Sequence, residues 1–115
     1  MSKEKMLGIL ESIISDPGSY KSGEYLEMHI FRYLIGIQKT EKQGIIEALQ
    51  EWIETQSEPR TMLAVRLAKK LGIDELIPQI IALRHKINIE GIFPKFYLRY
   101  IDETLIELQK KQLSN

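Results

Sequence analysis

This 115-residue sequence contains no cysteine, and that absence excludes several kinds of chemistry at once. Without thiols, the chain has no structural disulfide, no cysteine nucleophile and no thiolate-bound zinc. A single domain of this length buries roughly two-thirds of its unfolded surface, so it needs no such staple. The absence also fits a cytoplasmic protein, which is the location that we expect.

Long apolar runs are missing too. The longest stretch without a charged residue runs from Leu76 to Leu83, whereas a membrane-spanning helix needs about 20 apolar residues. The N-terminal segment is charged and amphipathic and has no small-residue cleavage site, so we expect neither a signal peptide nor a membrane partner. The chain has 16 basic and 16 acidic side chains. No overall field therefore attracts nucleic acid, and a charged partner must meet a local patch.

Motifs for catalysis and cofactor binding are also absent. We find no glycine-rich phosphate loop, no nucleophile elbow and no His-Glu-x-x-His pair. The two histidines, His29 and His85, fall on different expected helices. Neither has a glutamate three positions before it, as the ligands of di-iron bundles do. We therefore expect a protein that is not an enzyme and that carries no metal or other cofactor.

What the sequence does contain is helical periodicity from end to end, without the alternation that is typical of strands. We expect one all-α domain over residues 1–115 with about six helices. The first covers residues 3–15 and is followed by a break at residues 16–19, and the second covers residues 24–35. The other four are expected to begin at Thr40, at Pro59, near Asp74 or Pro78, and at Pro94.

Two Gly-Ile pairs, at Gly36 and Gly72, each follow an expected helix, and Gly91 repeats the pattern more loosely. Glycine just past a helix can take the left-handed conformation, and the apolar residue after it packs back on the last turn. We therefore expect the chain to turn at Gly36 and at Gly72 and to form antiparallel hairpins. The separation of the two glycines falls within the range of helical hairpin repeats.

One of these hairpins, mainly residues 58–88, resembles a HEAT repeat. The similarity lies in Val65-Arg66-x-Ala68-x-x-Leu71-Gly72 in the first helix, followed by Leu76-Ile77-Pro78-x-Ile80 in the second. The resemblance implies a short HEAT-like stack of antiparallel hairpins, and proteins of this kind usually hold a partner protein. A compact helical bundle is the alternative architecture.

Four glutamates follow helical spacing at the end of the third expected helix: Glu47, Glu51, Glu54 and Glu58. Like charges one turn apart destabilise an isolated helix by roughly a few tenths of a kcal/mol, and a basic partner would relieve this repulsion. The HEAT resemblance implies that this stripe faces the concave side of the stack. We expect it to bind another protein, together with Tyr33 and Tyr100 as exposed anchors. An ordinary solvated helix face is the alternative interpretation.

A small helical protein with an acidic stripe is similar, by analogy, to bacterial immunity proteins and antitoxins. The analogy implies a dedicated basic partner, such as a toxic nuclease, that the stripe would occlude. Two other functions remain open. Arg66, Lys69 and Arg84 would suit a helical-repeat protein that grips a nucleic-acid backbone, although the neutral net charge speaks against it. A self-associating structural module would bury the apolar side of its first or last helix.

Overall fold

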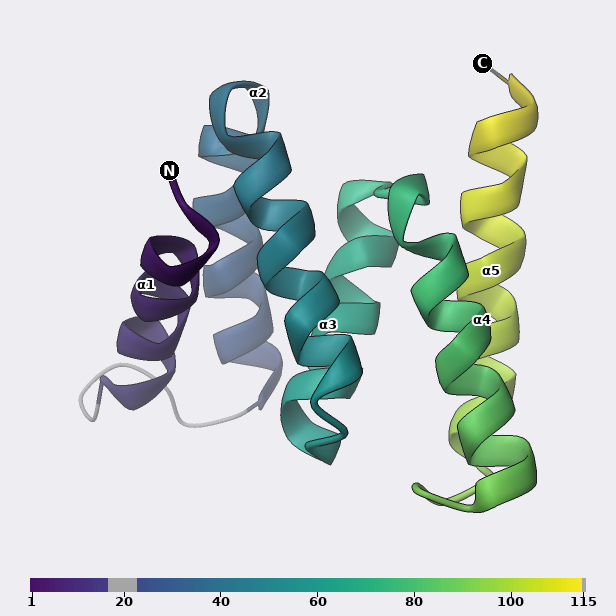
Figure 1. Ribbon diagram of the computed structural model, residues 1–115. Helices are drawn as coiled ribbons and strands as arrows, with labels where there is room; N and C mark the ends of the chain where they lie inside the picture. Colours follow the sequence, from purple (N-terminus) through teal and green to yellow (C-terminus); the bar gives the residue numbers. More distant parts are fainter. Residues whose placement is uncertain (17–22, 115) are drawn as a thin grey trace. The chain divides into compact units, whose positions relative to one another are not determined.

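The computed structural model describes residues 1–16 and 23–114, and every regular element in these two ranges is helical (Figure 1). The expected all-α class is therefore confirmed. Pro17, Gly18 and Ser19, which belong to the first expected break, lie outside the described residues. The chain divides into two compact units, Met1–Ala48 and Leu49–Asn115, and each is considered by itself. The expectation of a single domain stays a prediction.

The first unit contains helix α1, Lys3–Ser15, which has the expected bounds. Ser2 caps this helix because its Oγ accepts a hydrogen bond of 3.2 Å from the backbone N–H of Lys5. The core of the unit consists of fully or almost fully buried apolar side chains from α1 and from the helix that follows: Met6, Leu10, Ile30, Leu34 and Ile45. The N-terminal amine of Met1 forms an ion pair of 2.8 Å with Glu41.

The element α2, Gly23–Glu54, joins two helices across a kink at Glu41, and it covers the second and third expected helices. The predicted turn at Gly36 is wrong, because the helix continues through this exposed residue. The non-helical backbone inside α2 is at Glu41, with φ −119° and ψ 21°, and the ribbon changes direction along its length (Figure 1). Thr40 does not cap a new helix; its hydroxyl donates to the carbonyl oxygen of Ile37 at 3.4 Å. Glycine allows a helix to end but does not force it to, since it costs only about 1 kcal/mol relative to alanine inside a helix.

In the second unit, helix α3 runs over Glu58–Leu71, with Pro59 in its first turn. The predicted turn at Gly72 is confirmed, since this residue takes the left-handed conformation with φ 68°. The backbone N–H of Ile73 then donates to the carbonyl oxygen of Ala68 at 3.0 Å, and the Ile73 side chain is buried. This is the helix end that the Gly-Ile pattern predicts.

The chain then continues through a short 3-10 turn, η1, Asp74–Leu76, into helix α4, Ile77–His85. A π-helical turn, η2, Lys86–Glu90, ends at Gly91, which is also left-handed. Helix α5, Tyr97–Ser114, starts three residues after Pro94, where the sequence predicts its start. Proline favours a helix start but does not fix it, and here the residues from Pro94 to Phe96 form turns.

Helix α5 packs against both α3 and α4. At one end of α5, Asp102 accepts two hydrogen bonds from the guanidinium group of Arg84 on α4. Near its other end, the ammonium group of Lys111 donates to the carbonyl oxygen of Gly72. These contacts hold α5 alongside the α3–α4 hairpin.

Candidate functional site

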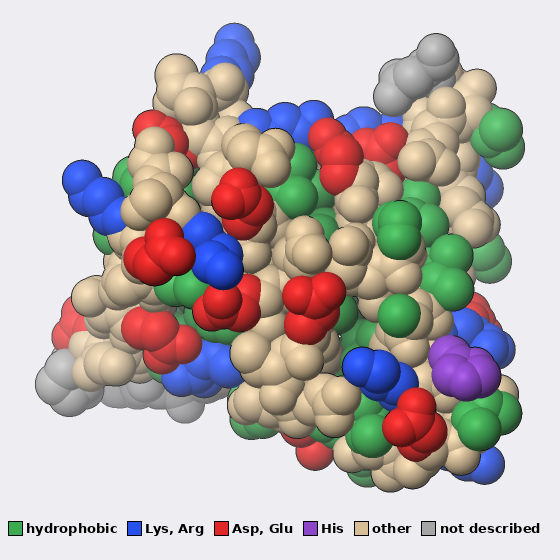
Figure 2. Space-filling view, viewed as in Figure 1, with side chains coloured by type: hydrophobic (Ala, Val, Ile, Leu, Met, Phe, Trp, Pro, Cys, Tyr) green, Lys and Arg blue, Asp and Glu red, His purple; other side chains and the backbone are tan. Residues whose placement is uncertain are grey.

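The C-terminal part of α2 carries the three glutamates that we call the acidic face: Glu47, Glu51 and Glu54. Glu47 belongs to the first unit, and Glu51 and Glu54 belong to the second. Trp52 and Ile53, on the other side of the same turns, are buried. Figure 2 shows acidic side chains over α2. Glu47 and Glu51 are half-buried and Glu54 is exposed. That this face binds a partner stays a prediction.

Two of these carboxylates have only neutral partners among the residues that the structure describes. Glu47 accepts a hydrogen bond of 3.3 Å from the amide of Gln43, and Glu54 accepts one of 3.5 Å from the amide of Gln50. Each amide lies one turn before its glutamate on the same helix. An amide leaves the negative charge of the carboxylate in place, so both remain able to attract a cation.

Glu58 does not continue the acidic face. Helix α2 ends at Glu54, Gln56 has a positive φ of 60°, and Glu58 is the first residue of α3. Its half-buried carboxylate accepts a hydrogen bond from the hydroxyl group of Tyr97 on α5. The spacing argument was wrong here because helical spacing places residues on one face only within a single helix.

The contact between Glu58 and Tyr97 also changes the acidity of the phenol. The hydrogen bond to Glu58 is the largest cause that raises the pKa of Tyr97. Burial and the negative charge of Glu58 raise this pKa further, whereas the positive charge of Arg66 lowers it. Glu58 therefore connects α3 to α5.

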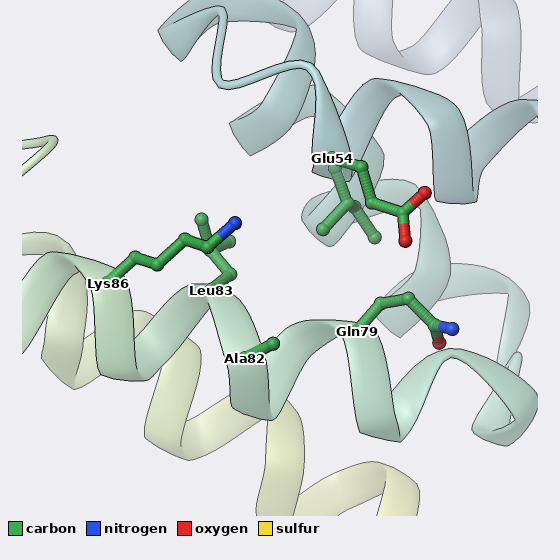
Figure 3. Close-up of a pocket in the computed structure, with 6 residues that line it drawn as sticks. Glu54, Gln79, Ala82, Leu83 and Lys86 are labelled. Atoms are coloured by element: carbon green, nitrogen blue, oxygen red, sulfur yellow. The ribbon is translucent and has the colours of Figure 1, made fainter.

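A small groove opens between the end of α2 and helix α4, within the second unit (Figure 3). Its volume is about 80 Å³. The groove opens to solvent at its rim, where Glu54 and Ala82 are exposed. We call it the α2–α4 groove, and six residues line it: Ile53, Glu54, Gln79, Ala82, Leu83 and Lys86.

Gln79 is the unusual member of this groove. Its Oε1 atom is buried and accepts no hydrogen bond from any described residue. A buried acceptor without a donor costs about 1–3 kcal/mol, so a group that brings a donor to this atom would be favoured. Sequence reasoning missed Gln79, although there was a signal: it is the one polar side chain in the run from Leu76 to Leu83.

The two tyrosines that the sequence singled out do not line the groove. Tyr33 is half-buried in the first unit. Tyr100 is half-buried on α5, where the ammonium group of Lys69 lies 4.9 Å from the centre of its ring. Tyr100 therefore belongs to the packing of α3 against α5, and the structure does not bring either tyrosine to the α2–α4 groove.

The basic residues of the nucleic-acid alternative are also separated. Arg66 and Lys69 lie one turn apart on α3, whereas Arg84 lies on α4 and is paired with Asp102. The hydrogen bond to Asp102, with its charge, raises the pKa of Arg84 and fixes the guanidinium group to a carboxylate. A cation held in this way is poorly placed to bind a phosphate.

Comparison of the chain with protein-family models, with curated proteins and with solved structures found no match. Within residues 1–16 and 23–114, no group of three or more His, Cys, Asp or Glu residues could hold a metal ion. No helix in the same ranges has the length and apolar character that crossing a bilayer requires. The candidate site therefore rests on its own geometry: two glutamates of the acidic face at the end of α2, beside the α2–α4 groove.

Proposed function

We propose that this protein is a non-catalytic helical module that binds a basic partner protein through the acidic face of α2. One observation carries the proposal. Glu54 is exposed at the rim of an open groove, and among the described residues its only partner is the neutral amide of Gln50. A carboxylate in this position keeps its charge available for a cation that arrives from outside.

Physical reasons favour a basic partner. The glutamates of the acidic face lie one turn apart, and like charges at this spacing repel each other. A positively charged surface removes the repulsion and is attracted from a distance, so the association rate rises at low ionic strength. The apolar walls of the α2–α4 groove, Ile53 and Leu83, can additionally take up part of a partner side chain.

We further propose that the helices form a short HEAT-like stack. The α3–α4 hairpin supports this proposal, because it turns at Gly72 and carries Pro78 in the first turn of α4. In such stacks the second helix of each hairpin lines the concave side, and α4 borders the α2–α4 groove. A dedicated basic toxin in a bacterial cytoplasm, held as immunity proteins and antitoxins hold theirs, is the partner class that we propose by analogy.

Affinity capture from the native host tests the proposed function. The bait is the full chain, and proteins that bind to it are identified by mass spectrometry. We expect a basic protein to be captured, and we expect the variant Glu47→Lys/Glu51→Lys/Glu54→Lys to lose it. The matched control, Glu90→Lys/Glu103→Lys/Glu107→Lys, reverses three charges at exposed positions elsewhere and should retain the partner. Equal capture by both variants would refute the acidic-face mechanism.

A second candidate function is self-association through α5. Ile106 and Leu113 lie two turns apart on this helix and expose 52% and 88% of their surface. Exposed apolar side chains on one helix face are typical of an interface. Light scattering over a range of protein concentrations tests it. A molar mass that rises with concentration in the wild type but stays that of a monomer in Ile106→Lys/Leu113→Lys supports self-association. A wild type that remains a monomer at every concentration excludes it.

A further inference from the structure

We propose that the α2–α4 groove holds one arginine side chain of the partner, with its guanidinium group between the Glu54 carboxylate and Oε1 of Gln79. This inference rests on the proposed function, because it names the chemical group that binds at the same site. It goes further in one respect: it predicts which residue of a basic partner the groove selects and which atoms make the contact.

The first argument is the unsatisfied acceptor. Oε1 of Gln79 is buried in the groove wall and receives no donor from the described residues. Buried side-chain oxygens in folded proteins are nearly always hydrogen-bonded. A group that enters this end of the groove is therefore favoured if it brings an N–H donor, and it is disfavoured if it brings only acceptors.

The second argument is the charge beside that acceptor. Figure 3 shows the Glu54 carboxylate on the same side of the groove as the Gln79 amide, with Lys86 at the other end. Gln79 and Lys86 are two helical turns apart, which corresponds to about 10 Å along α4. Because charge interactions weaken with distance, the end near Gln79 is governed by Glu54 and favours a cation.

The third argument is size and shape. A volume of about 80 Å³ compares with about 30 Å³ for one water molecule, so the groove has room for a small head group. A guanidinium group is planar and carries five N–H donors, so it can bind a carboxylate and an amide oxygen at once. An ammonium group is a single point of charge and suits this arrangement less well. Ile53, Ala82 and Leu83 line the groove and would cover the methylene stem.

Nuclear magnetic resonance titration of the full-length protein tests the inference. The probes are the tripeptide acetyl-Gly-Arg-Gly-amide and two analogues with lysine or citrulline in place of arginine. Citrulline has nearly the same shape as arginine but no charge. We expect saturable shifts of the Gln79 side-chain amide and of the backbone amides of Ala82 and Leu83 with arginine. Lysine should bind several-fold more weakly, and citrulline about tenfold more weakly or not at all.

Variants locate the contact. Glu54→Gln, which removes the negative charge, and Gln79→Leu, which removes the amide acceptor, should each weaken arginine binding at least about fivefold. Gln79→Glu should strengthen it, which shows that the groove is intact and that charge at this position matters. Gln109→Leu, on the exposed side of α5, is the matched control and should change nothing. If the arginine tripeptide causes no saturable shifts, or if the citrulline tripeptide binds equally tightly, the inference is overturned and the groove holds only water.

The outcome can be separated from that of the proposed function. Suppose that reversal of the acidic face abolishes capture of the partner, that Gln79→Leu leaves capture unchanged, and that the arginine tripeptide does not bind. The arginine groove is then refuted and the proposed function stands. If the tripeptide binds but no partner depends on the acidic face, the arginine groove stands and the proposed function fails.

Discussion

Thr61 and Thr104 are both fully buried, but their hydroxyl groups bind different partners. The hydroxyl of Thr61, on α3, donates at 2.7 Å to the carbonyl oxygen of Trp52 in the last turn of α2. That of Thr104 donates at 2.9 Å to Tyr100, one turn earlier in its own helix. The Trp52 carbonyl oxygen also accepts at 3.0 Å from the hydroxyl of Thr55, which lies just past the end of α2. Of these bonds, only that of Thr61 joins two elements.

We therefore predict that Thr61→Val lowers the free energy of unfolding by about 1–2 kcal/mol. Thr104→Val should change it by less than about 0.5 kcal/mol, because the helix itself already satisfies the Tyr100 carbonyl group. Urea unfolding followed by the fluorescence of Trp52, the single tryptophan, measures both values in the second unit. Equal effects of the two substitutions would contradict this interpretation of the Thr61 bond.

The contact between Tyr97 and Glu58 predicts a dependence of stability on pH. The pKa of Tyr97 is raised in the folded chain, chiefly by its hydrogen bond to Glu58, above the ordinary value of about 10 that the unfolded chain has. The folded state then holds the phenolic proton more tightly, so the contribution is complete below about pH 10 and is lost as the pH rises through the folded pKa.

Tyr97→Phe should be less stable than the wild type by about 1–2 kcal/mol near neutral pH. The difference should shrink as the pH rises above about 10, because the unfolded wild-type chain then loses the phenolic proton. The measurement is urea unfolding of both proteins from about pH 7 to about pH 11. The difference between their free energies of unfolding at each pH cancels the contributions of the other titrating groups. A difference that does not change across this range would show that the hydrogen bond is not the cause.

At the scale of the element, the two glycines that looked equivalent in the sequence have opposite roles. Gly72 takes a left-handed conformation, and a Cβ atom there would lie 3.3 Å from Nζ of Lys111. Gly36 lies inside α2, and a Cβ atom there would meet nothing within 4 Å. The same substitution should therefore have effects of opposite sign at the two positions.

We predict that Gly72→Ala destabilises the protein by about 1–2 kcal/mol, which is the cost of a left-handed residue with a side chain. Gly36→Ala should stabilise α2 by up to about 1 kcal/mol, since alanine is the better helix former. Urea unfolding followed by circular dichroism measures both. If Gly36→Ala were destabilising, Gly36 would be needed for a turn after all, and the helical course of α2 through Gly36 would be refuted.

Particular elements show how much of the fold the sequence could predict. The bounds of α1, the end of α3 at Gly72 and the start of α4 near Pro78 follow from local patterns, because caps, glycine and proline act on their own turns. The break of α2 lies at Glu41, five residues after the predicted turn at Gly36 and next to Thr40, where the sequence predicts a helix start. It lies where the Met1 amine pairs with this residue, 40 positions away in the sequence, and local propensity contains no information about such a contact.

At the scale of the whole molecule, the sequence predicted part of the candidate site. Glu51 and Glu54 lie in the last turns of α2 within the second unit, so their spacing was sufficient to place them on a common face. Glu58 was misplaced because α2 ends at Glu54 and Glu58 begins the next helix, and Gln79 was missed altogether. Their surroundings are built by residues that are distant in the sequence, Tyr97 for Glu58 and the end of α2 for Gln79.

Salt should weaken the complex if charge drives it. We predict that the affinity for the captured basic partner falls steeply as the ionic strength rises, because screening shortens the reach of the acidic face. In Glu51→Gln/Glu54→Gln, which removes two charges without reversing them, the dependence on salt should be clearly flatter. Isothermal titration calorimetry at several salt concentrations measures it. An affinity that does not change with salt would point to an apolar interface instead.

The most direct test of the central claim is a comparison of backbone hydrogen exchange in the free protein and in its complex with the captured partner. The account predicts slower exchange in the complex over the end of α2 and over α4, the two elements that border the α2–α4 groove. Helix α5 should exchange at the same rate in both states. Protection confined to α5, with α2 and α4 unchanged, would contradict the claim that the partner binds at the acidic face.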